Sequence, residues 1–475
     1  MTKQMHAHLI GICGTAMASL AGMLKQRGYR VTGSDAAAYP PMSDFLAGLG
    51  IAVDQPFHES NLQPRPDFVV VGNAISRGNV ELEATLDLRL TLRSLPQLLH
   101  DEFLAGHERL VVAGTHGKTT TSSLLAWLFS AGQRAASFLI GGIPENFGSS
   151  FQLDTGPEFI LEGDEYDSAF FDKGPKFLHY FPDALILTSV EFDHADIYHN
   201  LDEVKTAFRR LVNLVPGRGI LIAWDGHPNV DDCITRAFCR VERYGFGGRS
   251  SWRIVDVGYH PDRTCWSVLR EGRMWGSFEF PIAGEYNVLN ATAAAAMASH
   301  YGIDVKTIAD GLRTFRSVKR RLEVRSEAYG ITIVDDFAHH PTAIAQTLKA
   351  LRTRYPGRRL WAVLEPRSNT LRRRIFQKEL AESLGLADQV VVAGIFKLEA
   401  IPEQDRLHPE VLVSDLKQSG TPARWLRSAD EIVDSIAAEL REGDVVAILS
   451  NGGFDGIYEK LPARLRQLHE VPAQA

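Results

Sequence analysis

The sequence has few of the features that mark membrane, secreted or nucleic-acid-binding proteins. No apolar run is long enough to span a bilayer, and the first residues lack the hydrophobic core of a secretion signal. The 4 cysteines among 475 residues form no CxxC pair and are too sparse for a disulfide scaffold. A net charge of −7 provides no basic excess for nucleic acid. We therefore predict a cytoplasmic protein with reduced cysteines that binds neither nucleic acid nor membrane.

Internal repeats and low-complexity tracts are also missing, and the composition is that of an ordinary globular protein. Apolar residues make up 45% of the chain and charged residues 23%. One hydrophobic core rarely serves more than about 250–300 residues, so a chain of 475 residues should form about three domains.

The most informative stretch covers residues 108–132, ERLVVAGTHGKTTTSSLLAWLFSAG. Its pattern predicts a short buried strand, a glycine-containing loop and a helix that ends at Gly132. Glycines let successive backbone N–H groups turn toward an anion, and the following helix directs the positive end of its dipole there. Lys118 adds a mobile charge for the outer phosphates, and the Thr119 hydroxyl can bind Mg²⁺. The predicted phosphate-binding residues are Gly114, Thr115, His116, Gly117, Lys118, Thr119 and Thr120.

This loop is a shortened variant of the usual phosphate loop, because Val112 occupies the position of the outer glycine. A turn that merely joins a strand to a helix would need the small residues. It would not need Lys118 followed by two threonines.

Two further predicted strands, residues 158–161 and 184–189, each deliver a group of acids at the carboxyl end. Carboxylates this close repel one another unless a cation neutralises them, so a metal is the economical explanation. A solvated acidic turn remains the alternative for either group alone. The residues concerned are Glu162, Asp164, Glu165 and Asp167 after the first strand, and Glu191, Asp193, His194 and Asp196 after the second.

The amino-terminal segment has the layout of a nucleotide-binding βαβ unit. A strand at residues 8–12 runs into a turn with Gly11 and Gly14, and a second strand at 29–32 ends in Gly33-Ser34-Asp35. The third glycine of the dinucleotide fingerprint is replaced by Ala16, so a βαβ unit without ligand explains this segment equally well. A strand at 67–71 leads into a second small-residue turn, residues 73–76, which favours a ligand at this sheet edge.

Towards the carboxyl terminus, the alanine-rich helix that starts near residue 285 has Asn287 and Asn290 on one face. They could cap the helix or bind a ligand. After about residue 322 the α/β pattern returns, with polar residues at strand ends, where open parallel sheets bind ligands.

Taken together, these motifs resemble the Mur ligase family, the ATP-dependent amide ligases of peptidoglycan synthesis, over essentially the whole chain. The matching features are GTHGKTTT at 114–121, EGDE at 162–165, EFDH at 191–194, YNVLNATAAAA at 286–296, KRRLE at 319–323 and DDFAHHP at 335–341.

Within the family, GICGTAM at 11–17, EPRSNT at 365–370 and SNGGFDGIYEKL at 450–461 are most similar to the peptidoglycan-recycling branch. The resemblance implies an enzyme that joins UDP-N-acetylmuramate to the murein tripeptide L-alanyl-γ-D-glutamyl-meso-diaminopimelate through an acyl phosphate, using ATP and Mg²⁺. The alternative is the branch that adds L-alanine, which usually carries a PHRYxR-like stretch where this chain has EPRSNT.

The resemblance also implies roles for individual residues. Catalysis would involve Lys118, Glu162, His194, Arg321 and His339, with Mg²⁺ on Thr119, Glu162 and His194. Besides the phosphate loop, ATP would contact Asn287, Asn290, Arg321, Asp335 and Asp336. The UDP-sugar would contact Gly11, Gly14, Thr15, Ser34, Asp35, Asn73, Ala74, Ile75 and Ser76, and the peptide Arg367, Ser368 and Asn369.

The expected fold is α/β with three domains. These are a Rossmann-like UDP-sugar-binding domain at 1–105, a central P-loop ATPase domain with a parallel sheet at 106–320, and a Rossmann-like domain for the peptide acceptor at 321–475. We also expect hinge motion near residues 317–321, because a reactive acyl phosphate must be shielded from water. The oligomeric state is left open.

Two other classes of protein fit the motifs less well. A non-catalytic nucleotide sensor would not need the set of Lys118, Glu162, His194 and Arg321, whose groups serve phosphoryl transfer. A dinucleotide dehydrogenase, suggested by the first βαβ unit alone, does not explain the second phosphate loop.

Overall fold

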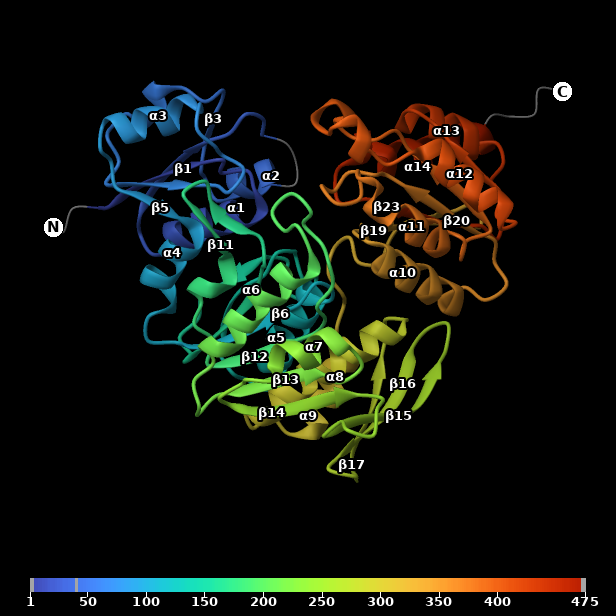
Figure 1. The fold of residues 1–475 in the computed structure, drawn as a ribbon, viewed down its shortest axis with the longest axis horizontal. Helices are drawn as coiled ribbons and strands as arrows, with labels where there is room; N and C mark the ends of the chain where they lie inside the picture. The colour runs from blue at the N-terminus through green and yellow to red at the C-terminus, as the bar shows by residue number, and fades with distance from the viewer. Residues whose placement is uncertain (1–3, 39–41, 471–475) are drawn as a thin grey trace.

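Three large sheets and one two-stranded sheet organise the chain in the computed structural model, which describes residues 4–38 and 42–470. In Figure 1 the amino-terminal region and the carboxy-terminal region lie above the central region, whose sheet carries the phosphate loop. No helix among the described residues is long and apolar enough to cross a membrane. The α/β fold class predicted from the sequence is confirmed.

The amino-terminal sheet has five parallel strands in the order β3-β2-β1-β4-β5. The predicted strand at 8–12 lies two residues earlier, because Gly11 turns the chain with a φ of +81°. The elements are β1 His6–Ile10, α1 Thr15–Gln26, β2 Arg30–Ser34, α2 Met42–Gly48, β3 Val53–Asp54, the 3₁₀ helix η1 Glu59–Leu62, β4 Phe68–Val71, α3 Val80–Asp87, β5 Leu92–Ser94, α4 Leu95–Leu99 and the π-helical turn η2 His100–Leu104.

The central sheet has ten strands in the order β17-β16-β15-β14-β13-β12-β6-β9-β7-β8. It is parallel from β15 to β7 and antiparallel at both ends. The elements are β6 Glu108–Ala113, α5 Lys118–Ala131, β7 Ser137–Leu139, β8 Phe151–Gln152, β9 Glu158–Gly163, β10 Asp167–Ala169, β11 Asp172–Pro175, the 3₁₀ helix η3 Lys176–His179, β12 Ala184–Leu187, α6 Leu201–Leu214, β13 Ile220–Trp224, α7 Pro228–Ile234, β14 Arg240–Gly245, β15 Trp252–Tyr259, β16 Thr264–Arg270, β17 Arg273–Phe280, α8 Glu285–His300 and α9 Val305–Arg313.

The carboxy-terminal sheet has the order β18-β19-β23-β20-β21-β22 and is parallel except for β18. The elements are β18 Glu323–Ala328, β19 Ile331–Asp336, α10 Pro341–Arg354, β20 Leu360–Leu364, the 3₁₀ helix η4 Arg374–Phe376, α11 Gln377–Leu384, β21 Gln389–Val392, the 3₁₀ helices η5 Leu398–Ala400 and η6 Glu403–Asp405, α12 Pro409–Gln418, β22 Ala423–Trp425, α13 Ala429–Ala437, β23 Val445–Leu449, the 3₁₀ helix η7 Phe454–Gly456 and α14 Ile457–Glu470.

Apolar packing crosses both boundaries of the central region. One buried cluster runs from the α5 and α8 face of the central sheet to α10, α11 and α12. Another joins α1 and α4 to the opposite face of the central sheet. The segment that leads into the carboxy-terminal sheet has positive φ angles at Ser317, Arg320 and Leu322, which is uncommon outside glycine. The hinge expected near this segment stays a prediction.

Candidate active site

The phosphate loop joins β6 to α5, as the sequence predicts. Gly114 has a φ of +139°, and a Cβ atom there would lie 2.1 Å from Thr188 Oγ1. Gly117 has a φ of +82°, and a Cβ atom there would lie 2.5 Å from Asn290 Oδ1. Both positions therefore need glycine for backbone conformation and for space. The loop is closed further by Thr115 N and His116 N, which donate to the main-chain oxygen and the hydroxyl of Ser189.

Lys118 begins α5, and its side chain folds back over the loop. Its Nζ donates to Gly114 O at 2.7 Å and to the carboxylate of Glu165 at 2.9 and 3.1 Å. Burial disfavours the ammonium charge, but Glu165 and Asp164 outweigh it and raise the pKa of Lys118. A permanent positive charge therefore lies beside the loop amides, where an anion would bind.

Thr119, the next residue, contacts Glu162 at the end of β9 and Arg321 from the start of the carboxy-terminal region. Its Oγ1 donates to Glu162 Oε1 at 3.0 Å, and Arg321 Nη2 lies 3.4 Å from the same hydroxyl. Glu162 Oε2 accepts from Gly141 N at 2.8 Å. Burial raises the pKa of Glu162, although Lys118 opposes this effect. Two regions of the chain thus converge on the first turn of α5.

His194 lies beside Glu165, with 3.4 Å between Nε2 and Oε1. Burial opposes its charge, yet the hydrogen bond to Glu165 and the charge of Asp193 raise the pKa of His194 to about 9. Potential ligand atoms of Asp164, Glu165 and His194 all lie within 4.8 Å of one another. Of the three predicted metal ligands, Thr119 and Glu162 contact each other, whereas His194 contacts Glu165 instead.

Neither asparagine of α8 caps the helix, because Gly284 is the N-cap and no side chain among the described residues caps it. Asn287 Nδ2 donates to Ala283 O at 2.8 Å. The Nδ2 of Asn290 is buried and finds no hydrogen-bond partner in the part of the chain that the structure describes. Because Asn290 also faces Gly117, its amide is free to bind a nucleotide seated on the loop.

We expect Asn290→Ala to raise the KM for ATP about fivefold, since a hydrogen bond from a neutral amide is worth about 1 kcal/mol. The melting temperature should change little, because Nδ2 loses no partner among the described residues. Asn287→Ala is the matched comparison, since it breaks a bond inside the protein and should destabilise by about 1 kcal/mol. Initial rates and thermal unfolding measure both effects. An unchanged KM for ATP in Asn290→Ala would contradict this role.

The residues after β19 approach the site from the carboxy-terminal region. His339 Nε2 lies 3.9 Å from Asp193 Oδ2, and its Nδ1 lies 2.9 Å from Phe337 O. Burial lowers the pKa of His339 and keeps the ring neutral at pH 7. Its position beside the 191–196 loop places it near the groups that surround Lys118.

The two acids predicted to contact ATP have protein partners. Asp335 Oδ2 lies 3.2 Å from Arg320 Nε, and burial raises the pKa of Asp335 to about 6. Asp336 accepts from Leu322 N at 2.8 Å and Ala338 N at 2.9 Å. The first of these bonds connects β19 to the segment that leads into the carboxy-terminal sheet. Any contact of these acids with a nucleotide stays a prediction.

The two turns predicted to hold the UDP-sugar lie side by side at the end of β1 and β4. A Cβ atom at Gly11 would lie 3.2 Å from the Ile75 side chain. Asp35 accepts from Cys13 N at 2.9 Å, so it shapes the first turn. Ser34 is buried, and its hydroxyl donates to Glu81, so only its main chain faces the turn. The other predicted residues here are Gly14 at the N-cap of α1, Thr15 as the first residue of α1, and the exposed Asn73, Ala74 and Ser76.

The predicted peptide-binding stretch follows β20 and touches the 193–196 loop. Arg367 lies on Gly452, where a Cβ atom would be 2.0 Å from Arg367 Nε, and its guanidinium lies 3.8 Å from the Phe396 ring centre. Asn369 Nδ2 donates to Asp196 Oδ2 at 2.7 Å. Ser368 Oγ accepts from the N–H of Leu371 at 3.1 Å. The acceptor region and the acidic loop are thus in direct contact.

Two residues of this site were not assigned a role from the sequence. Glu165 is the partner of Lys118, although the sequence showed it only as one acid among four. Arg372 donates to Asn369 and to Phe396 O, yet its buried Nε has no partner within the described residues. Its place in the run Arg372 to Arg374, directly after EPRSNT, is the signal that could have indicated it.

The residues fit Mg²⁺ and a nucleotide. The glycines leave a cradle that a Cβ atom would fill, Asn290 has an unpaired buried donor, and Thr119 with Glu162 provides the oxygen ligands that Mg²⁺ prefers.

A phosphate loop on a parallel sheet, with an acidic cluster beside it and a second α/β unit contributing an arginine, defines an ATP-using transferase or ligase. Three consecutive parts of the sequence match models of protein-family domains. These are described as "Mur ligase family, catalytic domain" at 6–106, "Mur ligase middle domain" at 112–298 and "Mur ligase, glutamate ligase domain" at 320–452. The chain belongs to the Mur ligase family.

Among curated relatives, a UDP-N-acetylmuramate–L-alanyl-γ-D-glutamyl-meso-2,6-diaminoheptandioate ligase of Escherichia coli is 42% identical and covers 96% of this chain and 97% of its own length. A UDP-N-acetylmuramate–L-alanine ligase of Carboxydothermus hydrogenoformans is 31% identical over 97% of this chain and 96% of its own. A crystal structure of a murein peptide ligase from Psychrobacter arcticus has 36% identity and a TM-score of 0.75, covering 97% of this chain and 98% of that one.

Proposed function

We propose that this protein joins the lactyl carboxylate of UDP-N-acetylmuramate to the amino group of L-alanyl-γ-D-glutamyl-meso-diaminopimelate, with ATP as the energy source. The observation that carries the chemistry is the convergence of Lys118, Thr119 and Arg321 at the phosphate loop. The sequence identity to the tripeptide ligase, 42% against 31% to the alanine ligase, supports the choice of acceptor.

The first step requires two anions to meet. The sugar carboxylate attacks the γ-phosphorus of ATP, giving an acyl phosphate and ADP. Phosphoryl transfer of this kind depends on positioning and charge neutralisation more than on covalent catalysis. Lys118, the loop amides and Arg321 would hold the phosphates, so that repulsion between the two anions is offset. Thr119 and Glu162 would hold Mg²⁺, which would supply further neutralisation of phosphate charge. His194, the third predicted ligand, pairs with Glu165 here and would have to lose its proton to join them.

In the second step the amine of the peptide attacks the acyl carbon, and phosphate leaves from the tetrahedral intermediate. The attacking nitrogen must lose a proton. His339 is neutral at pH 7 and lies beside Asp193, which can stabilise the imidazolium that forms. We therefore propose His339 as the group that accepts this proton.

Each substrate would use one region of the chain. We propose that residues 1–105 hold the UDP-sugar on the turns at Gly11 and Ile75, that 106–320 hold ATP, and that 321–475 hold the peptide. Arg367, with Arg372 beside it, would bind peptide carboxylates, because a guanidinium fork matches a carboxylate in two parallel hydrogen bonds.

The acceptor is tested by phosphate release from ATP and Mg²⁺ in the presence of UDP-N-acetylmuramate. We expect strong turnover with the tripeptide and at least about a hundredfold lower kcat/KM with L-alanine, since free alanine lacks the glutamyl and diaminopimelyl carboxylates that Arg367 and Arg372 would bind. Omitting the UDP-sugar is the control and should abolish turnover with either amine. Preference for L-alanine would make this the alanine-adding enzyme, and turnover without an acceptor would contradict the ligase reaction.

A further inference from the structure

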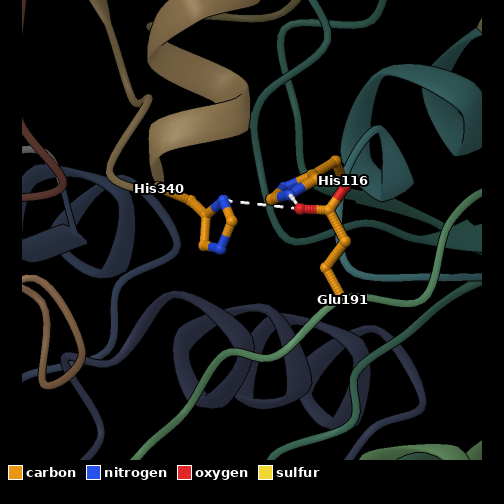
Figure 2. Close-up of side chains that lie close together, drawn as sticks. All are labelled: His116, Glu191 and His340. Atoms are coloured by element: carbon orange, nitrogen blue, oxygen red, sulfur yellow. Dashed lines mark hydrogen bonds and ion pairs between the residues drawn. The ribbon is translucent and has the colours of Figure 1, made fainter. Parts of the chain in front are cut away.

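Glu191 is surrounded by three histidines, of which only His116 was assigned a role, as part of the predicted phosphate loop. His116 Nε2 lies 3.4 Å and His340 Nδ1 lies 3.7 Å from Glu191 Oε2, and Figure 2 shows both rings turned toward this oxygen. A third imidazole, that of His227, has its Nε2 3.6 Å from Oε1. The three rings come from three places: the phosphate loop, the N-cap of α7 and the N-cap of α10.

The separations match those between ligands of one metal ion. Ligands at about 2.0–2.1 Å from a tetrahedral zinc ion lie about 3.4 Å from one another. Potential ligand atoms of His116, Glu191 and His340 all lie within 4.8 Å of each other. Two imidazoles and a carboxylate favour zinc or a related transition metal over Mg²⁺, which prefers oxygen.

The protonation and orientation of the ligands also fit. His340 Nε2 donates to Phe192 O at 3.2 Å, which leaves the Nδ1 lone pair facing Glu191. Donation of the second ring nitrogen to a carbonyl is the usual support of a metal-bound histidine. The side chain of Glu191 is about 79% buried and therefore not a solvated surface acid.

Thr342 competes for the same lone pairs. Its hydroxyl donates to Glu191 Oε2 at 2.7 Å, and its N–H donates to His340 Nδ1 at 3.2 Å. A bound metal would replace these two hydrogen bonds.

We propose that His116, Glu191 and His340 form a binding site for one divalent transition metal of the zinc class, separate from the Mg²⁺ site at Thr119 and Glu162. His227 lies close enough to add a fourth ligand after a small shift. Because His340 belongs to the carboxy-terminal region and the other ligands to the central one, the metal would hold these two regions together at the phosphate loop.

The test uses the full-length, nucleotide-free protein and chelator-buffered Zn²⁺ in equilibrium dialysis. We expect one Zn²⁺ per chain, and Glu191→Gln and His340→Gln should each weaken it at least about tenfold. Co²⁺ provides a second readout, because its visible spectrum reports ligation by imidazole nitrogen, and the absorption should fall in the same variants. Thermal unfolding without metal checks that each variant folds, and Thr342→Val, which removes a competing hydroxyl but no ligand, should retain or strengthen binding.

Two controls separate this site from its surroundings. His199→Gln alters an exposed histidine that pairs with Glu203 and should leave binding unchanged. Glu165→Gln alters the neighbouring cluster of Asp164, Glu165 and His194 and should also leave it unchanged. Loss of Zn²⁺ in Glu165→Gln with full binding in folded Glu191→Gln would overturn the proposal, as would the absence of stoichiometric binding. The readout needs neither ATP nor acceptor, so it is independent of the ligase assay.

Discussion

Lys118→Ala is expected to reduce ATP-dependent amide formation by at least about a thousandfold. The ammonium lies against the phosphate loop, and without it the negative charge of the transferring phosphoryl group loses its nearest cation. The KM for UDP-N-acetylmuramate should change far less, because its predicted binding turns are in the amino-terminal sheet. Phosphate release and product formation, measured with all three substrates, give the rate of amide formation. Their dependence on the concentration of UDP-N-acetylmuramate gives its KM.

A loss of activity in this variant must be separated from a loss of fold. Removing Lys118 leaves the buried Glu165 without its ion-pair partner, which is destabilising. The double variant Lys118→Ala, Glu165→Gln removes that unpaired charge, so it should regain thermal stability but not activity. Lys173→Ala, which removes an exposed lysine that pairs with Asp167 nearby, is the matched control and should remain fully active. Full activity in Lys118→Ala would show that the phosphate-loop assignment is wrong.

Arg367→Ala is expected to lower kcat/KM for the tripeptide about 30- to 100-fold, which corresponds to the loss of a charge-assisted hydrogen bond of about 2–3 kcal/mol. The effect should appear mainly in the KM for the peptide, with the KM for ATP unchanged. Arg367→Lys keeps the charge but not the fork, so it should recover only part of the loss. Initial rates at varied peptide concentration provide the measurement.

The Arg367 experiment also needs a stability check, because Glu365 Oε1 lies 3.2 Å from this guanidinium and is buried. Glu365 also accepts from Ser450, so part of its hydrogen bonding survives the substitution. Arg313→Ala, which breaks an exposed ion pair with Asp310 on α9, should leave the peptide KM unchanged. An unchanged peptide KM in Arg367→Ala would assign acceptor binding to other residues and make Arg372 the next candidate.

Most secondary structure around the site could be predicted from local pattern. The strand and helix that flank the phosphate loop were expected because a short apolar run and a helical spacing are local signals. The strands β20 and β23 belong to the α/β pattern that was expected after about residue 322, for the same reason. β1 lies two residues earlier than expected, since the chain turns at Gly11 and the strand ends before it. Counting apolar residues alone does not reveal this turn.

The site was less completely predictable. The sequence showed four acids after β9 but could not tell which one would face Lys118, because that choice depends on how β9 lies beside β6. It left two roles open for the asparagines of α8, and the structure excludes capping because Gly284 holds the N-cap. The motifs EFDH and DDFAHHP lie more than a hundred residues apart, so the sequence does not indicate that their side chains meet.

The α/β class, the phosphate loop and the family can all be predicted from the sequence, because each depends on residue types at short, characteristic spacing. The sequence does not show which side chains meet across the boundaries of the central region. Arg321 reaches Thr119, Thr370 donates to Asp193, and His340 faces Glu191. Such contacts depend on how separate sheets pack against one another, and that packing is set by apolar surfaces distributed over the whole chain rather than by any local motif.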